Sequence, residues 1–266
     1  MRVTRTIEET REALAAARQV RERIGLVPTM GAFHEGHLSL IRAARAECDR
    51  VVVSLFINPS QFGPADDFSR YPRDEARDAA LAEAEGADLL FAPRAEEIYP
   101  AGFDTWIDVG ELGGVLEGAA RPGHFRGVAT VCCKLFGIVR PDLAYFGRKD
   151  AQQVAVIKQV VRDLNLELTV RALPTVRDAD GLALSSRNQY LSPDERQEAL
   201  KLPRALAAGR EAYRDAHDAV GVASDLLKGV NVDYVTIADL DGPTLAAAVR
   251  IGSARLIDNL RLEEAT

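Results

Sequence analysis

The sequence predicts an α/β protein with a doubly wound parallel sheet and a second, smaller α+β domain. Over the first two thirds of the chain, short apolar runs alternate with helical patterns, which is the order of elements in a parallel sheet covered by helices. After about Pro174, a polar, turn-rich stretch leads into alanine-rich helices and late strands. We therefore expect a first domain over residues 1–175 and a second over residues 176–266.

The elements of the first domain follow from hydrophobic spacing. The segment "RVVVSLFIN", residues 50–58, is an almost unbroken β-branched run, which is typical of a strand covered on both faces. By the same reasoning, we expect helices over 7–24, 38–47, 73–87, 127–139 and 151–165. The other expected strands are 25–28, 88–93, 142–147 and 166–173, with a loop over 59–72 and a turn-rich segment over 96–125.

In the second domain, a polar segment over 175–193 precedes the helices, and Ser192 with Pro193 marks the start of the first helix. The predicted strands are 232–240 and 254–260. The sequence shows no internal repeat and no low-complexity tract.

Composition excludes several classes of protein. A formal net charge of -7 argues against broad binding to nucleic acid, which depends on clustered Lys and Arg. No apolar run approaches the roughly 18 residues needed to cross a bilayer, so we expect no membrane span. The N-terminus lacks the apolar core of a secretory signal, and the three cysteines suit neither a disulfide framework nor a C-x-x-C pair. We therefore expect a cytoplasmic protein.

The first candidate site is "PTMGAFHEGH", residues 28–37, at a predicted strand-to-helix turn. A helix N-terminus offers free backbone N–H groups and a dipole that favours an anion. Gly31 and Gly36 let the backbone approach a ligand, while His34 and His37 would lie on one side of the first helical turn. This pattern favours a phosphate site, but two surface histidines near a cap, or an H-x-x-H zinc pair, would have the same spacing.

The second candidate, "FINPSQFGP", follows a buried strand and would reach the same edge of the sheet. Asn58, Ser60 and Gln61 suit hydroxyls and carboxylates, because an amide both donates and accepts hydrogen bonds. An ordinary turn built on Asn-Pro is the alternative interpretation.

Three further clusters concentrate positive charge on an acidic chain. "RPGHFRGV" contains Arg121, His124 and Arg126, "YFGRKDAQQVAVI" contains Arg148, Lys149, Asp150 and Gln153, and "LALSSRNQYLS" contains Ser185, Ser186 and Arg187. Lys149 is a candidate for binding phosphate, while Asp150 would cap the next helix or hold a cation. The last cluster could clamp triphosphate oxygens through charge-assisted hydrogen bonds. Each cluster alone is equally compatible with a solvated charged loop.

Taken together, "PTMGAFHEGH", "FINPSQF", "RPGHFRGV", "FGRKDAQQ" and "LSSRN", in this order, closely resemble the pantothenate synthetase family of pantoate:β-alanine ligases. The resemblance runs from about Gly25 to Asn259. This family belongs to the H-I-G-H nucleotidyltransferase superfamily, and its members are typically homodimers. The resemblance implies a Rossmann-like domain over 1–175 that binds nucleotide and pantoate, and a C-terminal domain over 176–266 that closes over ATP.

By that resemblance, the chain uses ATP and Mg²⁺ to condense (R)-pantoate with β-alanine. The pantoate carboxylate attacks the α-phosphate to give pantoyl adenylate and pyrophosphate. The β-alanine amine then displaces AMP and gives pantothenate, a precursor of coenzyme A. The implied partners are these small molecules and a second copy of the chain, with no nucleic acid and no membrane.

The resemblance also assigns roles to individual residues. His37 matches the family's proton donor, and the expected catalytic residues are His37, His34, Lys149 and Arg187. ATP binding is expected at Met30, Gly31, His34, Gly36, His37, Gly147, Arg148, Lys149, Asp150, Val176, Leu184, Ser185, Ser186 and Arg187. Binding of pantoate and β-alanine is expected at Gln61, Gln153, Asn58 and Arg121. The motifs single out no magnesium ligand.

Two positions depart from the family pattern: Phe33 stands where Leu is commoner, and Arg148 stands where an acidic or polar residue is expected. Arg148 would add positive charge near the phosphates. The competing interpretation is another H-I-G-H nucleotidyltransferase that acts on a different small acid or alcohol. A class I aminoacyl-tRNA synthetase would need a tRNA-binding module, which is not evident here. A non-catalytic nucleotide sensor would bind ATP without exchanging pyrophosphate.

Overall fold

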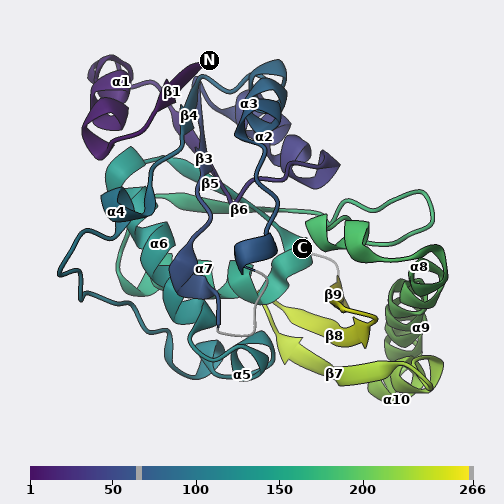
Figure 1. The fold of residues 1–266 in the computed structure, drawn as a ribbon. Coiled ribbons are helices and arrows are strands. Elements are labelled where there is room, and N and C mark those ends of the chain that lie inside the picture. The colour runs from purple at the N-terminus through teal and green to yellow at the C-terminus, as the bar shows by residue number, and fades with distance from the viewer. Residues whose placement is uncertain (64–67, 264–266) are drawn as a thin grey trace. The chain divides into compact units, whose positions relative to one another are not determined.

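A computed structural model of the chain describes residues 1–63 and 68–263, so residues 64–67 of the predicted loop and the last three residues of the predicted second domain lie outside the described residues. The chain divides into two compact units (Figure 1). The first consists of Met1–Gly147 and Ala155–Leu173, and the second of Arg148–Val154 and Pro174–Thr266.

The first unit contains a six-stranded parallel sheet in the order β1-β4-β3-β2-β5-β6. Its strands are β1 (Arg2–Thr4), β2 (Ile24–Thr29), β3 (Arg50–Leu55), β4 (Leu89–Phe91), β5 (Leu143–Gly147) and β6 (Thr169–Leu173). Its helices are α1 (Ile7–Gln19), α2 (Glu35–Glu47), α3 (Glu75–Ala84), α4 (Ala95–Ile98), α5 (Glu117–Ala120) and α6 (His124–Val139), with α7 (Ala151–Asp163) shared between the units. Short 3-10 turns are η1 (Pro59–Gln61), η2 (Phe68–Arg70) and η3 (Gly110–Gly113).

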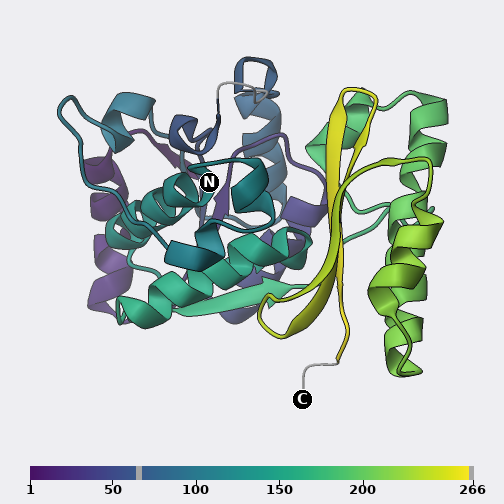
Figure 2. The same ribbon diagram turned by 90° about the horizontal axis from the view of Figure 1, so that it is seen from below.

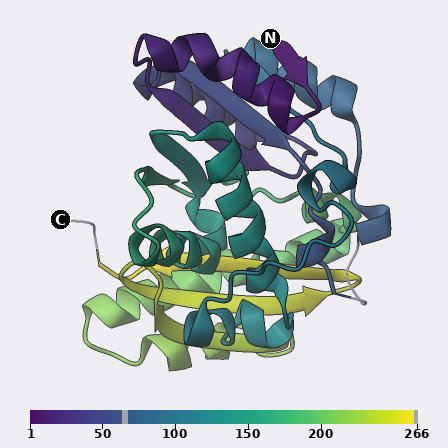
Figure 3. The same cartoon turned by 90° about the vertical axis from the view of Figure 1, so that its left-hand side faces the viewer.

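Helices cover both faces of this sheet, which confirms the predicted doubly wound, Rossmann-like fold. On one face, Leu40 and Ile41 of α2 pack with Val27, Val51 and Val53 of the sheet. On the other side, α1 and α6 pack against each other and face the viewer in Figure 3. Strands β2 and β3 are therefore buried along nearly their whole length, as expected for parallel strands with helices on both faces.

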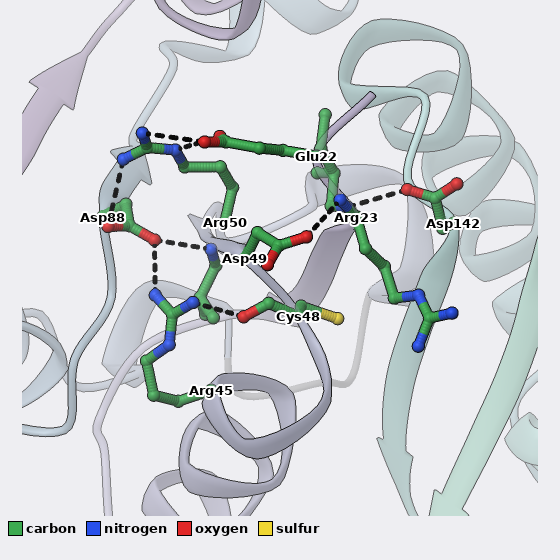
Figure 4. A network of polar contacts seen from close by, with 10 residues as sticks. Glu22, Arg23, Arg45, Cys48, Asp49, Arg50, Asp88 and Asp142 are labelled. Carbon is green, nitrogen blue, oxygen red and sulfur yellow. Dashed lines mark hydrogen bonds and ion pairs between the residues drawn. The ribbon is translucent and has the colours of Figure 1, made fainter. Parts of the chain in front are cut away.

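Three aspartates hold the amino ends of the central strands together (Figure 4). Asp49, Asp88 and Asp142 each stand immediately before a strand. Each carboxylate accepts a backbone N–H from the start of a neighbouring strand: Arg23 to Asp49 at 2.8 Å, Val51 to Asp88 at 2.8 Å and Ile24 to Asp142 at 2.7 Å. These contacts satisfy N–H groups that lie at the end of the ladder and fix the strand register.

The strand order reverses between β2 and β5, because β3 lies outward from β2 while β6 lies outward from β5. In sheets of this kind, ligands bind beyond the carboxyl ends of the strands at the point of reversal. Thr29 and Gly147 end these two strands. The fold therefore places the turn with His34 and His37 where a ligand site is expected.

The second unit contains an antiparallel sheet in the order β7-β8-β9, formed by β7 (Asn231–Asp239), β8 (Pro243–Ile251) and β9 (Ala254–Arg261). Its helices are α8 (Pro193–Ala199), α9 (Lys201–Arg214) and α10 (Ala219–Leu226), and its 3-10 turns are η4 (Arg148–Asp150) and η5 (Ser186–Tyr190). The helices lie along one face of the sheet (Figure 2). Leu202, Leu206, Leu245 and Val249 belong to the core between them. This arrangement confirms the predicted α+β character.

Some element bounds differ from those predicted. The helix expected over 7–24 ends at Gln19, and Arg21 adopts a left-handed φ of 58°, which turns the chain toward β2. The strand expected over 50–58 ends at Leu55, since Asn58 already caps η1. Within residues 1–63 and 68–263, no helix has both the length and the apolar character needed to cross a bilayer.

Candidate active site

The turn after β2 is held by a buried carboxylate from α3. Gly31 and Ala32 have positive φ angles of 91° and 54°, and alanine rarely adopts this conformation. Asp78, only 1% exposed, accepts the backbone N–H groups of Ala32 and Phe33, both at 2.8 Å. Sequence reasoning missed Asp78. One feature of the sequence indicates its role: Asp78 lies four residues before Ala82, and so on the buried side of α3.

The two histidines form a reciprocal cap at the start of α2. His34 is the N-cap residue, and its Nδ1 accepts the N–H of Gly36 at 3.1 Å. The Nδ1 of His37 accepts the N–H of His34 at 3.4 Å, and the ring centroids lie 4.3 Å apart. A Cβ at Gly36 would lie 2.9 Å from the His34 ring, so this packing needs glycine.

The cap also assigns the proton on each neutral ring. A backbone N–H can only donate, so the Nδ1 atom that accepts it carries no proton. In both neutral imidazoles the proton is therefore on Nε2. His34 and His37 can thus offer Nε2–H donors, beside the positive end of the α2 dipole, without carrying a charge themselves.

Asn58 is buried at the centre of a hydrogen-bond network, and its contact with pantoate stays a prediction. It is 1% exposed, and its Oδ1 accepts from the Ser60 N–H, from the Ser60 hydroxyl and from the Tyr99 hydroxyl at 3.3, 2.8 and 2.8 Å. Its Nδ2 donates to the Gly127 carbonyl at 3.2 Å and to Gln61 Oε1 at 3.0 Å. Because the Ser60 N–H must donate and the Gly127 carbonyl must accept, only one orientation of the Asn58 amide satisfies both.

That orientation determines the orientation of Gln61 as well. The Oε1 of Gln61 faces Asn58, and its Nε2 donates to Met30 Sδ at 3.2 Å. The backbone carbonyl of Gln61 accepts from His124 Nδ1 at 2.9 Å and from the Arg121 guanidinium at 3.3 Å. The structure therefore brings Met30, Asn58, Gln61 and Arg121 together, and Arg121 and His124 hold the backbone of Gln61.

An aromatic group packs beside this network and supports Tyr99. Trp106 stacks on Tyr99 with ring centroids 6.1 Å apart, and the Arg126 guanidinium lies 5.0 Å from the Trp106 ring. Burial raises the pKa of the Tyr99 phenol above its ordinary value, so its hydroxyl remains a donor for Asn58. Lys134 lies 4.5 Å from the Phe103 ring, and burial lowers the pKa of its ammonium group.

Gly147 ends β5 in the first unit, and the remaining predicted residues belong to the second unit. In η4, Lys149 Nζ lies 3.3 Å from Asp150 Oδ1, and Gln153 follows in the first turn of α7. Arg148 pairs with Asp241 at 2.9 Å, with both side chains about a quarter exposed. The expectation that Arg148 adds positive charge near the phosphates stays a prediction, and the Asp241 carboxylate would offset part of that charge.

Residues 176–185 form a hairpin-like loop that leads into η5. The Leu184 N–H donates to the Val176 carbonyl at 3.0 Å. Ser185 caps η5, and its hydroxyl accepts the Arg187 N–H at 3.3 Å, while Ser186 opens the turn. Asn188 Nδ2 donates to the Ala183 carbonyl at 3.0 Å. These contacts fix the backbone on which Ser185, Ser186 and Arg187 stand.

Metal binding was an alternative for the histidine pair. In the part of the chain that the structure describes, histidine, cysteine and carboxylate side chains form no group of three or more that could hold a metal ion.

Comparisons with known proteins identify the family. A sequence model of the pantoate-beta-alanine ligase family matches residues 2–261. The chain belongs to this family. Its membership confirms the resemblance expected from the five motifs, and with it the predicted ligase activity in pantothenate synthesis.

Relatives match over nearly the whole length. The chain is 55% identical to pantothenate synthetase of Heliobacterium modesticaldum over 279 residues, covering 97% of this chain and 99% of the relative. It is 55% identical to that of Roseiflexus castenholzii over 280 residues, covering 99% and 100%.

Solved structures of the family share the fold. Pantothenate synthetase from Thermus thermophilus superposes with a TM-score of 0.94 at 47% identity, covering 99% of this chain and 100% of the other. The enzyme from Francisella tularensis, solved with beta-gamma ATP and β-alanine, superposes with a TM-score of 0.86 at 35% identity, covering 100% and 99%.

Proposed function

We propose that the chain condenses (R)-pantoate with β-alanine at the expense of ATP, which becomes AMP and pyrophosphate, through a pantoyl adenylate. The observation that carries this proposal is the reciprocal imidazole cap of α2, beyond the carboxyl end of β2, in a member of the pantoate-beta-alanine ligase family. The Francisella tularensis relative, solved with an ATP compound and β-alanine, supports the choice of substrates.

In the first step, a carboxylate oxygen of pantoate forms a bond to the α-phosphorus. The bond from that phosphorus to the oxygen of the β-phosphate breaks, and pyrophosphate leaves with the electron pair. The Nε2–H groups of His34 and His37 donate to the phosphate oxygens, and Lys149 and Arg187 supply positive charge. Such fixed donors stabilise the transition state more than the ground state. The remaining predicted ATP contacts are Met30, Gly31, Gly36, Gly147, Arg148, Asp150, Val176, Leu184, Ser185 and Ser186.

Pantoate is held by amides in this proposal. Gln61 and Gln153 orient the acid for in-line attack, which converts a bimolecular encounter into a positioned reaction. Asn58 contributes by fixing the Gln61 amide, since it is itself 1% exposed and hydrogen-bonded to five groups around it. Arg121 contributes by donating to the backbone carbonyl of Gln61.

In the second step, the β-alanine amine attacks the acyl carbon, the bond to the AMP oxygen breaks, and the ammonium formed on nitrogen loses a proton. A competing water molecule would hydrolyse the acyl adenylate, so the site must exclude water. We propose that residues 176–266 form the domain that closes over ATP, while residues 1–175 bind nucleotide and pantoate.

Magnesium enters with ATP in this proposal. Mg²⁺ commonly binds through one or two carboxylates and the phosphates of a substrate, and it keeps several waters. Asp150 fits that mode, because its carboxylate is about half exposed and lies beside Lys149. The ion would neutralise phosphate charge, while the histidines and Lys149 orient the oxygens.

Pyrophosphate exchange tests this function. The protein should exchange labelled pyrophosphate into ATP when pantoate is present, and should form AMP in proportion to amide once β-alanine is added. A panel of small carboxylic acids distinguishes it from other nucleotidyltransferases of the superfamily. Equal exchange with other acids, or ATP binding without any exchange, would contradict the proposal.

We also propose a homodimer, on the strength of the family resemblance, and a cytoplasmic location, on the strength of the N-terminal sequence and the cysteine pattern. Sedimentation velocity at several concentrations should give twice the mass of the 28.9 kDa chain. A monomer at every concentration that retains full activity would contradict the dimer, and secretion of the full-length protein from its native cell would contradict the cytoplasmic location.

A further inference from the structure

Asn259, in the edge strand β9 of the second unit, binds the backbone that carries Lys149. Its side-chain Nδ2 donates to two successive carbonyls, those of Arg148 and Lys149, each at 2.9 Å. Asn259 is 8% exposed, and both hydrogen bonds are partly buried. One amide thus uses both of its hydrogens to fix consecutive peptide groups of η4.

The neighbouring Asp258 holds a second segment of the same unit. Its carboxylate pairs with both terminal nitrogens of Arg177, at 2.6 and 2.9 Å, and also accepts the backbone N–H of Asn259 at 2.8 Å. Arg177 donates in turn to the Gly181 carbonyl at 3.1 Å, inside the loop that precedes Ser185. Successive side chains of a strand point in different directions, so one strand can bind both segments.

The hydrogen bonds from Asn259 fix the backbone from which the Lys149 side chain extends. A lysine has a long stem with several rotatable bonds, and its ammonium is placed only as well as the backbone that carries it. At η4 the Arg148 and Lys149 carbonyls are fixed by Asn259, and the Arg148 guanidinium is fixed by Asp241. Loss of the Asn259 amide would remove the donor from two partly buried carbonyls and loosen the turn η4 that precedes α7.

We propose that Asn259 is a positioning residue that sets the place of Lys149 during adenylate formation. Asp258, the preceding residue of β9, holds the backbone of Asn259 and, through Arg177, the Val176–Arg187 segment. This inference rests on the proposed function, because it assumes that Lys149 acts on the triphosphate. Asn259 does not itself touch substrate in this scheme. It acts through the peptide groups on either side of the Lys149 Cα.

A double-mutant cycle with the full chain tests the proposal. Pantoate-dependent pyrophosphate exchange is measured for the wild type, Asn259→Ala, Lys149→Ala and the double variant. We expect Asn259→Ala to slow exchange about ten- to a hundredfold, the loss typical of a reacting group displaced by about 1 Å. In the Lys149→Ala background the same change should slow exchange less than about threefold, because neighbouring residues that act as a unit are not additive.

The matched control is Asn231→Ala, the same substitution at an exposed position at the start of β7. It should exchange pyrophosphate at the wild-type rate. Circular dichroism and urea unfolding check that each variant is folded. If Asn259→Ala does not fold, the cycle is run with Asn259→Ser, which keeps one hydroxyl donor and should give an intermediate loss of rate.

Two results would overturn the inference. One is an Asn259 variant that is folded and exchanges pyrophosphate like Asn231→Ala. The other is an equal loss from the Asn259 substitution with and without Lys149, which would indicate a general structural role. A wild-type protein that shows no pantoate-dependent exchange would instead refute the proposed function, so the two failures are distinguishable.

Discussion

Gly127 in α6 should be essential for the placement of Gln61. A Cβ built on Gly127 would lie 2.4 Å from the Ser60 carbonyl oxygen, 2.6 Å from its carbon and 2.7 Å from the Gln61 nitrogen. These are all backbone atoms, so no side-chain rotation relieves the overlap. Gly127→Ala must therefore push α6 away from η1.

The size of the effect follows from this geometry. Ordinary van der Waals contact begins near 3.4 Å, so α6 and η1 must separate by about 1 Å. Alanine is favoured over glycine inside a helix by about 0.5–1 kcal/mol, whereas overpacking costs about 1–3 kcal/mol. We expect a net loss of about 0.5–2 kcal/mol in the free energy of unfolding. A 1 Å shift of Gln61 should lower kcat/KM for pantoate by about ten- to a hundredfold.

Urea unfolding and pantoate-dependent pyrophosphate exchange at saturating ATP measure the two effects. The matched control is Gly137→Ala in the same helix, where the added Cβ would have no described atom within 4 Å apart from the adjacent residues and the helix's own backbone. That variant should be stabilised by about 0.5–1 kcal/mol and should keep its activity, because its only change is the gain in helix preference. If Gly127→Ala were as stable and as active as Gly137→Ala, the close packing of α6 on η1 would not determine the position of Gln61.

Three further predictions concern charged and polar groups. His37→Ala and Lys149→Ala should each slow adenylate formation by about two to three powers of ten; the urea midpoint should change little for Lys149→Ala and fall slightly for His37→Ala, which also removes the acceptor of the His34 N–H, and unfolding of either variant would indicate a structural role instead. Asp78→Asn should lower the free energy of unfolding by about 1–3 kcal/mol, because its amide cannot accept two backbone N–H groups equally well; a wild-type urea midpoint would contradict this. Hydrogen bonding and charge from Arg5 lower the pKa of Glu75 below its ordinary 4.5, a stabilisation that is present above that pH and lost as pH falls through the folded pKa. Stability of Glu75→Gln, followed by urea unfolding from pH 6 to pH 3, should therefore fall less steeply than that of the wild type.

Much of the fold could be predicted because hydrophobic patterning is strongest where helices cover both faces of a sheet. The run in β3 is buried along almost its whole length, and its sequence is correspondingly unambiguous. The strand β8, at the centre of the second sheet, was missed because its "LAAAV" segment has little β-branched character, although six successive residues of it are buried. β1, with three residues, is too short for any periodicity.

The candidate site was predictable in a different way. Motifs identify side chains with the chemistry to contact a ligand, such as His34, His37 and Lys149. Motifs do not identify the buried residues that fix the backbone beneath those side chains. Such a holding residue acts through a contact with a distant part of the chain, which no short motif contains. Asp78 accepts N–H groups from a turn 46 and 45 residues earlier, and Asn259 donates to carbonyls 111 and 110 residues earlier.

Holding residues and residues that contact substrate should respond differently to truncation. Asp78, Asn58 and Asn259 are each buried and hydrogen-bonded to backbone groups of the turns that carry the proposed site residues. A truncated holding residue leaves unpaired buried groups, so it should lower both stability and rate. A truncated contact residue such as Lys149, whose side chain contacts Asp150 and not the backbone of its turn, leaves the hydrogen bonds of the turn intact, so it should lower the rate alone. Plotting the loss of unfolding free energy against the loss of exchange rate should therefore separate the two groups, and overlapping distributions would indicate that the turns hold their shape without these buried residues.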